Sequence, residues 1–366
     1  MKLLTAFRKR REMRKWKVVI VSAYKGLAEK KKLNRAQKDE VQDFYKGLIG
    51  REIPLYSHEY FYSRTGHFTK DYVPTNIYHC ELVPKANDHT ASKVLCDKNL
   101  CDLLLPDAPM PRTWIKNMNG YYYGPYGKSV TEAEAVSLCQ EMTDVIIKPS
   151  LRSKGDGVRK IEVHGGITNV DGMTVEQLFR HYRKNFIIQD CVRQHPAMAA
   201  LNPTSLNTLR ILSYRSGDEV LIVYAVIRIG RLGKDIDNQS AGGISTAVLE
   251  GGRLDKVAYS GYLAKVAYGG YKEPGVEKTD TGIVLDGYPV PSFEKALALV
   301  RRLQLQLPYF NLVGWDIAID EAGEPVLIEF NTNTGLSQSA VQTGMGRYTE
   351  RIFRELWPKP NTWFKE

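Results

Sequence analysis

Apolar residues form two short runs near the end of the chain, separated by a turn. Residues 313–320 and 326–330 are mainly apolar, and the segment 321–325 between them contains the Gly and Pro typical of a tight turn. This pattern predicts a β-hairpin. Its polar exceptions are Asp316 on the first strand and Glu329 and Asn331 on the second. Because side chains alternate along a strand, Glu329 and Asn331 are predicted to project to the same side.

The remaining periodicity predicts a mixture of helices and strands. Apolar spacing of three to four residues predicts helices over residues 28–49, 92–105, 131–141, 175–182 and 293–305. Strands are predicted over residues 145–149, 158–163, 186–192, 209–214 and 219–229, the last two forming an antiparallel set with the hairpin. Residues 16–23 fit a helix or an early strand, and the aromatic-rich segment 53–84 is predicted to be irregular. This irregular succession indicates the α+β class.

Composition is that of a globular protein with more than one domain or subdomain. The chain has 366 residues, of which 43% are hydrophobic. No apolar run approaches the roughly 18 residues of a membrane span, and the cationic start lacks a signal-peptide core. The five cysteines lack the spacing of a zinc site or a disulfide framework. We therefore expect a cytoplasmic protein with reduced thiols.

The net charge of +10 is concentrated at one end. Residues 1–38 hold fourteen Lys or Arg against two Glu, a net of +12, so the remainder carries about −2. This arm mixes basic residues with Leu3, Leu4, Phe7 and Trp16, which suits peripheral contact with an anionic membrane, at the inner membrane face. The alternatives are a solvated basic helix and nucleic-acid binding, which is disfavoured because the rest of the chain lacks a nucleic-acid module.

The polar residues of the hairpin are candidate metal ligands. A buried carboxylate needs a partner, and two carboxylates with an amide oxygen suit Mg²⁺, which leaves its other positions to water and phosphate. Asp316, Glu329 and Asn331 are therefore predicted to bind Mg²⁺. The alternative is that the two acids only form salt bridges.

A second candidate lies after the predicted strand 145–149. Lys148 ends this apolar strand, and the loop that follows contains Gly155 and Gly157, which permit close approach of the backbone to a phosphate. The loop fits neither the Rossmann fingerprint nor the Walker A motif. An ordinary glycine hairpin is the alternative.

Two further segments carry polar residues next to apolar strands. Arg210 lies within an apolar run, where it would form an ion pair or bind a phosphate or carboxylate. The strand 186–192 turns polar afterwards, which fits either a core strand or an adenine-binding hinge. Residues 234–243 are polar and glycine-bearing, and are predicted to form a loop over a site.

Taken together, these elements resemble the ATP-grasp superfamily, and most closely its sugar-transfer-associated branch, often labelled alpha-L-glutamate ligase-related. The resemblance covers roughly residues 90–345 and includes the 13-residue step from Asp316 to Glu329. It is supported by the order of five spaced elements and by the phrases Asp97-Lys98-Asn99, Leu206-Asn207-Thr208-Leu209-Arg210, Ala241-Gly242-Gly243-Ile244 and Val313-Gly314-Trp315-Asp316. Two positions depart from the pattern: Thr334 stands where such ligases have Pro, and Gln189-Asp190 stands where a Glu is common.

The resemblance implies an ATP-grasp fold, with two α+β subdomains that grip ATP and a smaller domain before them. We expect a basic arm over residues 1–38, an N-terminal domain over 39–106, subdomains over 107–190 and 191–350, the second with the Mg²⁺ site, and a C-terminal tail over 351–366.

It also implies roles for individual residues. Lys148 and Arg210 would be catalytic, Arg210 by stabilising the transferring phosphoryl group. ATP would be bound by Lys98, Lys148, Ser150, Ser153, Gly155, Gly157, Gln189, Cys191, Val192, Gln194 and His195. Two Mg²⁺ ions would be bound by Asp316, Glu329 and Asn331, and the second substrate by Asn238, Gly242, Gly243, Gly335, Ser337 and Ser339.

The implied activity is that of an ATP-dependent carboxylate–amine ligase acting through an acyl phosphate on a small-molecule acid and amine. An amino acid and a sugar acid or surface-glycan precursor are the implied substrates. Two alternatives stay open: an ATP-dependent phosphotransferase that acts on a hydroxyl, and a nucleotide-binding module without catalysis.

Overall fold

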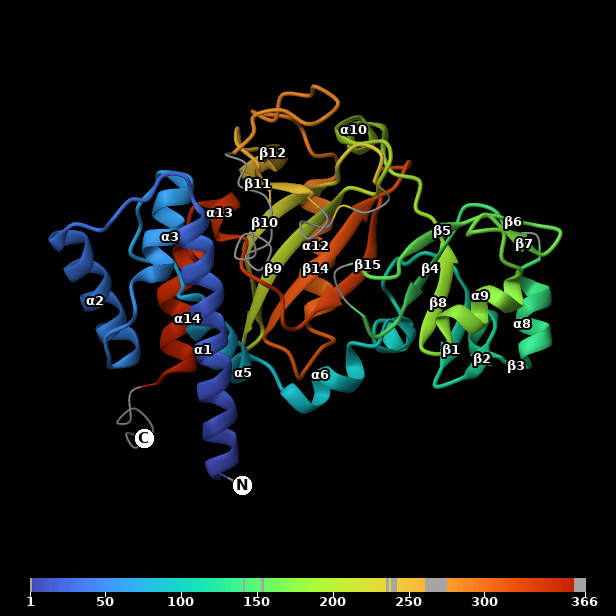
Figure 1. Cartoon of the computed structure of the whole chain (residues 1–366), viewed down its shortest axis with the longest axis horizontal. Coiled ribbons are helices and arrows are strands. Elements are labelled where there is room, and N and C mark those ends of the chain that lie inside the picture. Colours follow the sequence, from blue (N-terminus) through green and yellow to red (C-terminus); the bar gives the residue numbers. More distant parts are fainter. Residues whose placement is uncertain are drawn as a thin grey trace.

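A computed structural model describes residues 2–140, 142–152, 155–234, 237, 242–260 and 275–358. N-terminal helices, a central sheet and a smaller sheet lie side by side (Figure 1). The last helix, α14 (Thr349–Leu356), returns to pack against the N-terminal helices. Within these ranges, no helix combines the length and the apolar composition needed to cross a bilayer.

The N-terminal region is mainly helical, including most of the segment predicted to be irregular. It contains α1 (Lys2–Gly26), α2 (Arg35–Ile49), α3 (Tyr56–Thr65), α4 (Thr75–Ile77), a π-helical turn (Tyr78–Leu82) and α5 (Val83–Ala86). The prediction holds for residues 66–74 and is wrong for the helical parts of 53–84, where tertiary packing outweighs the modest helix propensity of aromatic residues. Tyr60 and Phe61 of α3 pack with Ile20 and Tyr24 of α1 and with Tyr72.

The helix predicted over residues 92–105 is broken into three pieces. These are α6 (His89–Leu95), a 3₁₀ turn (Lys98–Leu100) and α7 (Cys101–Leu104). The side chain of Asp97 accepts a hydrogen bond from the N–H of Asn99 and so caps a new turn instead of continuing the helix. As a result, Lys98 lies on a short turn between the two sheets.

The smaller sheet has the strand order β3-β2-β1-β8-β4-β5. Its strands are β1 (Thr113–Met118), β2 (Tyr121–Tyr123), β3 (Ser129–Val130), β4 (Val145–Pro149), β5 (Arg159–Ile161) and β8 (Phe186–Asp190). Helices α8 (Glu132–Leu138) and α9 (Val175–Tyr182) share a core with Ile115, Ile147 and Ile188 of the sheet. Since side chains alternate, Lys148 projects from the opposite face. A separate ribbon pairs β6 (Val163–His164) with β7 (Ile167–Thr168).

The central sheet contains the predicted hairpin and has the order β12-β11-β10-β9-β14-β15, with β13 also paired to β11. Its strands are β9 (Thr208–Ser216), β10 (Glu219–Ile229), β11 (Ile244–Leu249), β12 (Arg253–Leu254), β13 (Tyr259–Ser260), β14 (Leu312–Ile319) and β15 (Pro325–Asn331). The prediction of an antiparallel hairpin is confirmed by the pairing of β14 with β15.

The two faces of the central sheet have different coverings. Helix α12 (Phe293–Gln304) packs on the face that carries Leu209, Ile211 and Trp315. On the other face, Leu212, Tyr214 and Leu312 pack against residues of α2, α5 and α14. The N-terminal helices therefore share a core with this sheet. The domain boundaries given above stay a prediction.

Candidate active site

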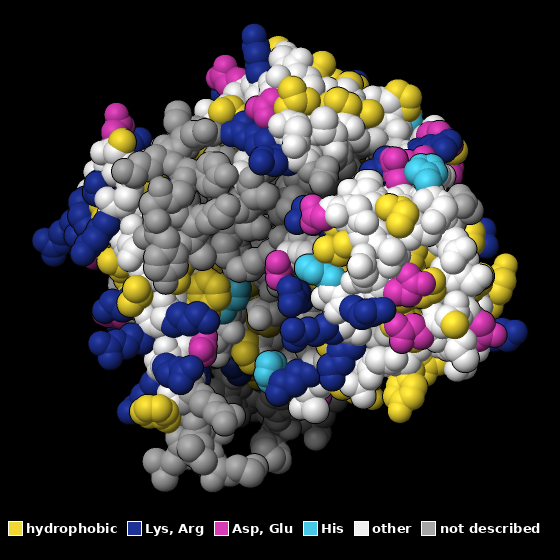
Figure 2. Space-filling model, turned by 45° about the vertical axis from the view of Figure 1, so that its right-hand side comes forward, with side chains coloured by type: hydrophobic (Ala, Val, Ile, Leu, Met, Phe, Trp, Pro, Cys, Tyr) yellow, Lys and Arg dark blue, Asp and Glu magenta, His cyan; other side chains and the backbone are white. Residues whose placement is uncertain are grey.

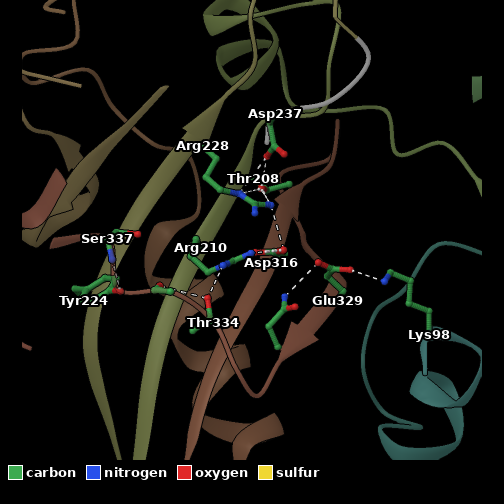
Figure 3. Close-up of polar contacts among 12 residues, drawn as sticks. Lys98, Thr208, Arg210, Tyr224, Arg228, Asp237, Asp316, Glu329, Thr334 and Ser337 are labelled. Carbon is green, nitrogen blue, oxygen red and sulfur yellow. Dashed lines mark hydrogen bonds and ion pairs between the residues drawn. The ribbon is translucent and has the colours of Figure 1, made fainter. Parts of the chain in front are cut away.

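A row of charged residues crosses the central sheet. Asp316 of β14 lies opposite Arg210 of β9 on one side and opposite Glu329 of β15 on the other. Directly opposed residues in a sheet share a face, so the three side chains project together. Figure 3 shows this row, with Lys98 approaching Glu329 from the turn after α6.

Asp316 is enclosed by two arginines. Its side chain is only 1% exposed, and its carboxylate accepts hydrogen bonds from Nε and Nη2 of Arg210, the latter at 2.9 Å. Nη2 of Arg228 lies 3.1 Å from the same carboxylate. Burial of a carboxylate is costly unless charged donors compensate it, and these guanidinium groups do so. The alternative prediction of a salt bridge thus describes the contacts of Asp316 in this structure.

Arg228 connects Asp316 to a second acid. Its Nε lies 3.5 Å from the carboxylate of Asp237, and it donates hydrogen bonds to Oγ1 of Thr208. Arg210 reaches the other way and donates to Oγ1 of Thr334 at 2.6 Å. A metal ion at Asp316 would compete with these arginines for its carboxylate oxygens. If Arg228 moved away from Asp316, Asp237 beside it would still compensate its charge.

Glu329 is more accessible than Asp316 and lies among amino and amide groups. Nζ of Lys98 is 3.1 Å from its carboxylate, and Nδ2 of Asn331 donates to it at 3.2 Å. Burial alone would raise the pKa of Glu329, but Lys98, Asn331, Arg210 and Lys148 together hold this pKa well below its usual range. Glu329 is therefore an anion at neutral pH, as a ligand of Mg²⁺ must be.

Lys148 is buried without a direct partner. It is 7% exposed, and among the described residues no hydrogen bond or ion pair involves its amino group. Burial lowers the pKa of Lys148 to about 8, against the opposing effect of Glu329, and the charge of Lys98 lowers it further. A buried amine of this kind marks a candidate functional site, because a purely structural lysine would be paired.

The loop after Lys148 contains two glycines with positive φ, a backbone conformation that other residues rarely adopt. Gly155 and Gly157 have φ values of +69° and +74°. A Cβ on Gly157 would lie 2.9 Å from Cγ of Pro149, so only glycine fits there. The hydroxyl of Ser150 is buried and has no hydrogen-bond partner among the described residues. An orphaned donor beside a buried lysine fits a phosphate-binding loop. Ser153 lies outside the described residues.

One cavity brings several of these groups together. Its volume is about 1040 Å³, and its lining includes Lys98, Lys148, Gln189, Glu329 and Asn331. These groups suit a bound nucleotide. The two amino groups suit its phosphates, and the anionic carboxylate and the amide suit its Mg²⁺. Asp316 and Arg210 are not part of this lining; they follow Glu329 in the row of charged residues across the central sheet.

The predicted adenine and ribose residues divide into two groups. Gln189 lines the cavity, and its amide donates to Oγ1 of Thr113 at 3.0 Å. Cys191 and Val192 follow directly after β8, with the N–H of Cys191 donating to the backbone of Asp144. Their ligand contacts stay a prediction.

The side chains of Gln194 and His195 form hydrogen bonds within the protein. Gln194 donates to the carbonyls of Asn202 and Ser205, and Nδ1 of His195 accepts from Ala197 to cap α10 (Pro196–Leu201). Neither is among the described residues that line the cavity. Their predicted place near ribose stays a prediction.

The predicted second-substrate residues that the structure describes lie directly before β11 and in the segment after β15. Gly243 packs so tightly that a Cβ would lie 2.3 Å from the carbonyl oxygen of Asp237, and Gly242 accepts from Arg231. The N–H of Ser337 donates to the hydroxyl of Tyr224 at 2.9 Å. Gly335 has open space at its Cβ position, and Ser339 lies in α13 (Gln338–Val341). Asn238 lies outside the described residues.

Thr334, which replaces the proline of the ligase pattern, is accommodated by Gly314. A Cβ on Gly314 would lie 2.7 Å from Cγ2 of Thr334. The hydroxyl of Thr334 can then accept the hydrogen bond from Arg210 that a proline could not accept. This substitution therefore adds a side-chain partner for Arg210.

The depressed pKa of Lys148 leads to a pH-dependent prediction. Above pH 8 the amine is neutral in the free protein, and binding of an anionic phosphate favours its charged form. Nucleotide binding should therefore take up a proton, and the affinity should fall about tenfold between pH 7 and pH 9. Calorimetry in buffers of different ionisation enthalpy measures this uptake. An identical proton uptake by Lys148→Gln would contradict the assignment.

Comparison with known proteins identifies the family. A family model described as sugar-transfer associated ATP-grasp matches residues 78–352. Since the match covers well over half of the chain, the protein belongs to the sugar-transfer associated ATP-grasp family. The predicted ATP-grasp fold and its α+β class are thereby confirmed. No curated protein matches the sequence.

Similar solved structures include three ligases. The ATP-grasp ligase PsnB complexed with its minimal precursor has 14% identity and a TM-score of 0.41, over 74% of this chain and 62% of that chain. VanG D-Ala:D-Ser ligase from Enterococcus faecalis has 13% identity and a TM-score of 0.43, over 74% and 63%. The L-amino acid ligase from Bacillus licheniformis has 10% identity and a TM-score of 0.38, over 71% and 48%. The chain thus spans less than two thirds of each of these proteins. The family assignment rests on the family match.

Proposed function

We propose that this protein is an ATP-dependent carboxylate–amine ligase that acts through an acyl phosphate. The observation that carries the proposal is the buried Lys148, which has no hydrogen-bond or ion-pair partner among the described residues and shares a cavity with Lys98, Glu329 and Asn331. These side chains are the complement of a nucleotide's phosphates and its metal ion.

Each of these residues has its own role in the proposed reaction. Lys98 and Lys148 would neutralise charge on the β- and γ-phosphates while a substrate carboxylate attacks the γ-phosphorus. Glu329 and Asn331, with Asp316 once Arg228 has released it, would hold two Mg²⁺ ions, which supply further charge neutralisation. Arg210 would stabilise the transferring phosphoryl group. ADP would leave as the acyl phosphate forms. The amine would then attack the carbonyl carbon of the acyl phosphate and lose a proton, and the amide would form as phosphate leaves.

The substrates in this proposal are an amino acid and a sugar acid or surface-glycan precursor. The support is the family's description as sugar-transfer associated. A phosphate-release screen over acid and amine pairs, with mass spectrometry of the products, tests this. The proposal expects ADP, free phosphate and an amide. ADP with a phosphorylated substrate would identify a phosphotransferase, and absence of turnover with retained nucleotide binding would identify a non-catalytic module.

We also propose that the outer side of α1 contacts an anionic membrane surface. Arg10, Arg11 and Arg14 are exposed on α1 and do not line the cavity, and Phe7 is 68% exposed. Trp16, in contrast, stacks on His79 and faces inward. The contact therefore depends on the basic side chains.

Removal of these charges should weaken membrane binding without affecting nucleotide chemistry. At about 1 kcal/mol per basic residue, R10Q/R11Q/R14Q should bind phosphatidylserine-containing vesicles about 10²-fold more weakly. The control K46Q/K128Q/K184Q removes the same charge from exposed lysines outside the basic arm. Vesicle co-sedimentation measures both. Equal binding by the two variants, or no binding by the unmodified protein, would refute the membrane contact.

A further inference from the structure

The cavity extends beyond the residues assigned to the nucleotide. Its volume of about 1040 Å³ is at the upper limit of the roughly 300–1,000 Å³ typical of a small-molecule site. One end contains Lys98, Lys148 and Gln189. The other end is walled by α1, the π-helical turn, α5 and α6, and we call it the basic end after its residues Lys9, Lys15, Trp16, His79, Lys85 and Lys93.

The acids at the basic end are already neutralised. Glu81 is 8% exposed, with Nη2 of Arg51 at 2.8 Å and Nζ of Lys9 at 3.6 Å. Glu12 lies 3.4 Å from Nζ of Lys15. The lysines that remain are not compensated in this way, so the basic end has an excess of positive charge.

Lys85 and Lys93 supply that excess. Nζ of Lys85 lies 5.0 Å from the ring centroid of Trp357, and within the part of the chain that the structure describes Lys93 has neither a hydrogen bond nor an ion pair. Lys and Arg side chains gather in the lower middle of the face shown in Figure 2. Lysines of this kind act as point charges toward phosphate or carboxylate groups.

A neutral stack joins the basic end to the metal-binding strand. The rings of Trp16 and His79 are parallel within 9° at 3.9 Å, and Nδ1 of His79 lies 3.3 Å from Oδ1 of Asn333, two residues after Asn331. Burial lowers the pKa of His79 to about 4, so the stack is uncharged at neutral pH. A ligand that passes Asn331 would therefore meet an aromatic wall and then the lysines.

We propose that the basic end binds an anionic group, phosphate or carboxylate, that the substrate carries in addition to its reacting groups. This inference rests on the proposed ligase function, because it assigns the substrate to the part of the cavity that the nucleotide leaves open. Lys9, Lys15 and Trp16 lie outside residues 78–352, the part matched by the family. The N-terminal helix thus contributes to the aromatic wall through Trp16, and the anion itself is assigned to Lys85 and Lys93.

The test measures binding of simple anions with MgADP at saturation. Glycerol 3-phosphate is the phosphate probe, tricarballylate is the carboxylate probe and glycerol is the neutral control. K85Q/K93Q should weaken the preferred anion about five- to thirtyfold, the effect of losing two partly solvated charges. It should leave MgADP affinity unchanged. K25Q/K46Q is the matched control, since both lysines are exposed and neither lines the cavity.

The two probes distinguish the source of the anion, and the separate MgADP titration distinguishes this inference from the proposed function. If MgADP binds but neither anion does, the inference is overturned and the nucleotide site stands. If MgADP fails to bind, the nucleotide assignment fails, and the anion titration without nucleotide still tests the basic end. If K85Q/K93Q and K25Q/K46Q weakened anion binding equally, the effect would come from the net charge of the protein and not from the basic end. This result would overturn the inference.

Discussion

Glu329→Gln should abolish turnover, with a loss of at least about 10²–10³-fold, the typical cost of removing one charge-stabilising group from an active site. The carboxylate of Glu329 lies 3.1 Å from Nζ of Lys98 and accepts from Asn331. Its pKa is held well below the usual range, so Glu329 is anionic at neutral pH and available as a metal ligand. The amide of Gln keeps the shape and removes the charge. Phosphate release at saturating ATP and Mg²⁺ measures the effect.

Glu321→Gln is the matched control for this variant. Glu321 is an exposed acid in the turn of the same hairpin, so its loss changes the net charge equally without touching the cavity. We expect the activity of Glu321→Gln to equal that of the unmodified protein. Near-native turnover in Glu329→Gln would remove the metal assignment.

Arg210→Lys should lower turnover by about 10²-fold or more while the protein stays folded. The Arg210 guanidinium contacts both oxygens of Asp316 and the hydroxyl of Thr334, a forked arrangement that one amino group cannot reproduce. The positive charge is kept, and Arg228 still pairs with Asp316, so the buried acid remains compensated. The variant therefore tests the geometry of the guanidinium group while the positive charge is unchanged.

Arg215→Lys on the same strand serves as its control. Arg215 donates from Nε to the carbonyl of Gly217, away from the cavity lining, and its replacement should leave turnover unchanged. Thermal unfolding of both variants checks the fold. If Arg210→Lys keeps full activity, Arg210 serves only as a partner for Asp316.

The hairpin and Lys148 could be predicted because their signals are local. A carboxylate or an amine inside an apolar strand is costly, so its presence there indicates a partner or a ligand without knowledge of the rest of the fold. The pairing of Asp316 with Glu329 then follows from the turn between the two strands.

Arg228 and the structural role of Gln194 could not be predicted in the same way. Arg228 lies in an apolar strand, as Arg210 does, but its link to Asp316 depends on the order in which β10, β9 and β14 pair. Gln194 lies in a polar segment that fits a ligand site equally well. Its hydrogen bonds to Asn202 and Ser205 depend on the path of the following loop. Long-range pairing decides both cases.

The break in the predicted helix 92–105 shows how one side chain redirects the backbone. Asp97 can either continue a helix or cap a new turn, and the helical periodicity on both sides conceals this choice. The structure has the cap, which brings Lys98 to within 3.1 Å of Glu329. The cap thus explains why Lys98 lies near Glu329, where a phosphate contact is predicted. An unbroken helix would not explain this position.

The most direct test of this account is a crystal structure with Mg²⁺ and a non-hydrolysable ATP analogue. The account predicts β- and γ-phosphates within hydrogen-bond distance of Lys98 and Lys148, metal ions on Glu329 and Asn331, and adenine beside Gln189. A nucleotide bound elsewhere, or phosphates remote from Lys148 and Glu329, would contradict it.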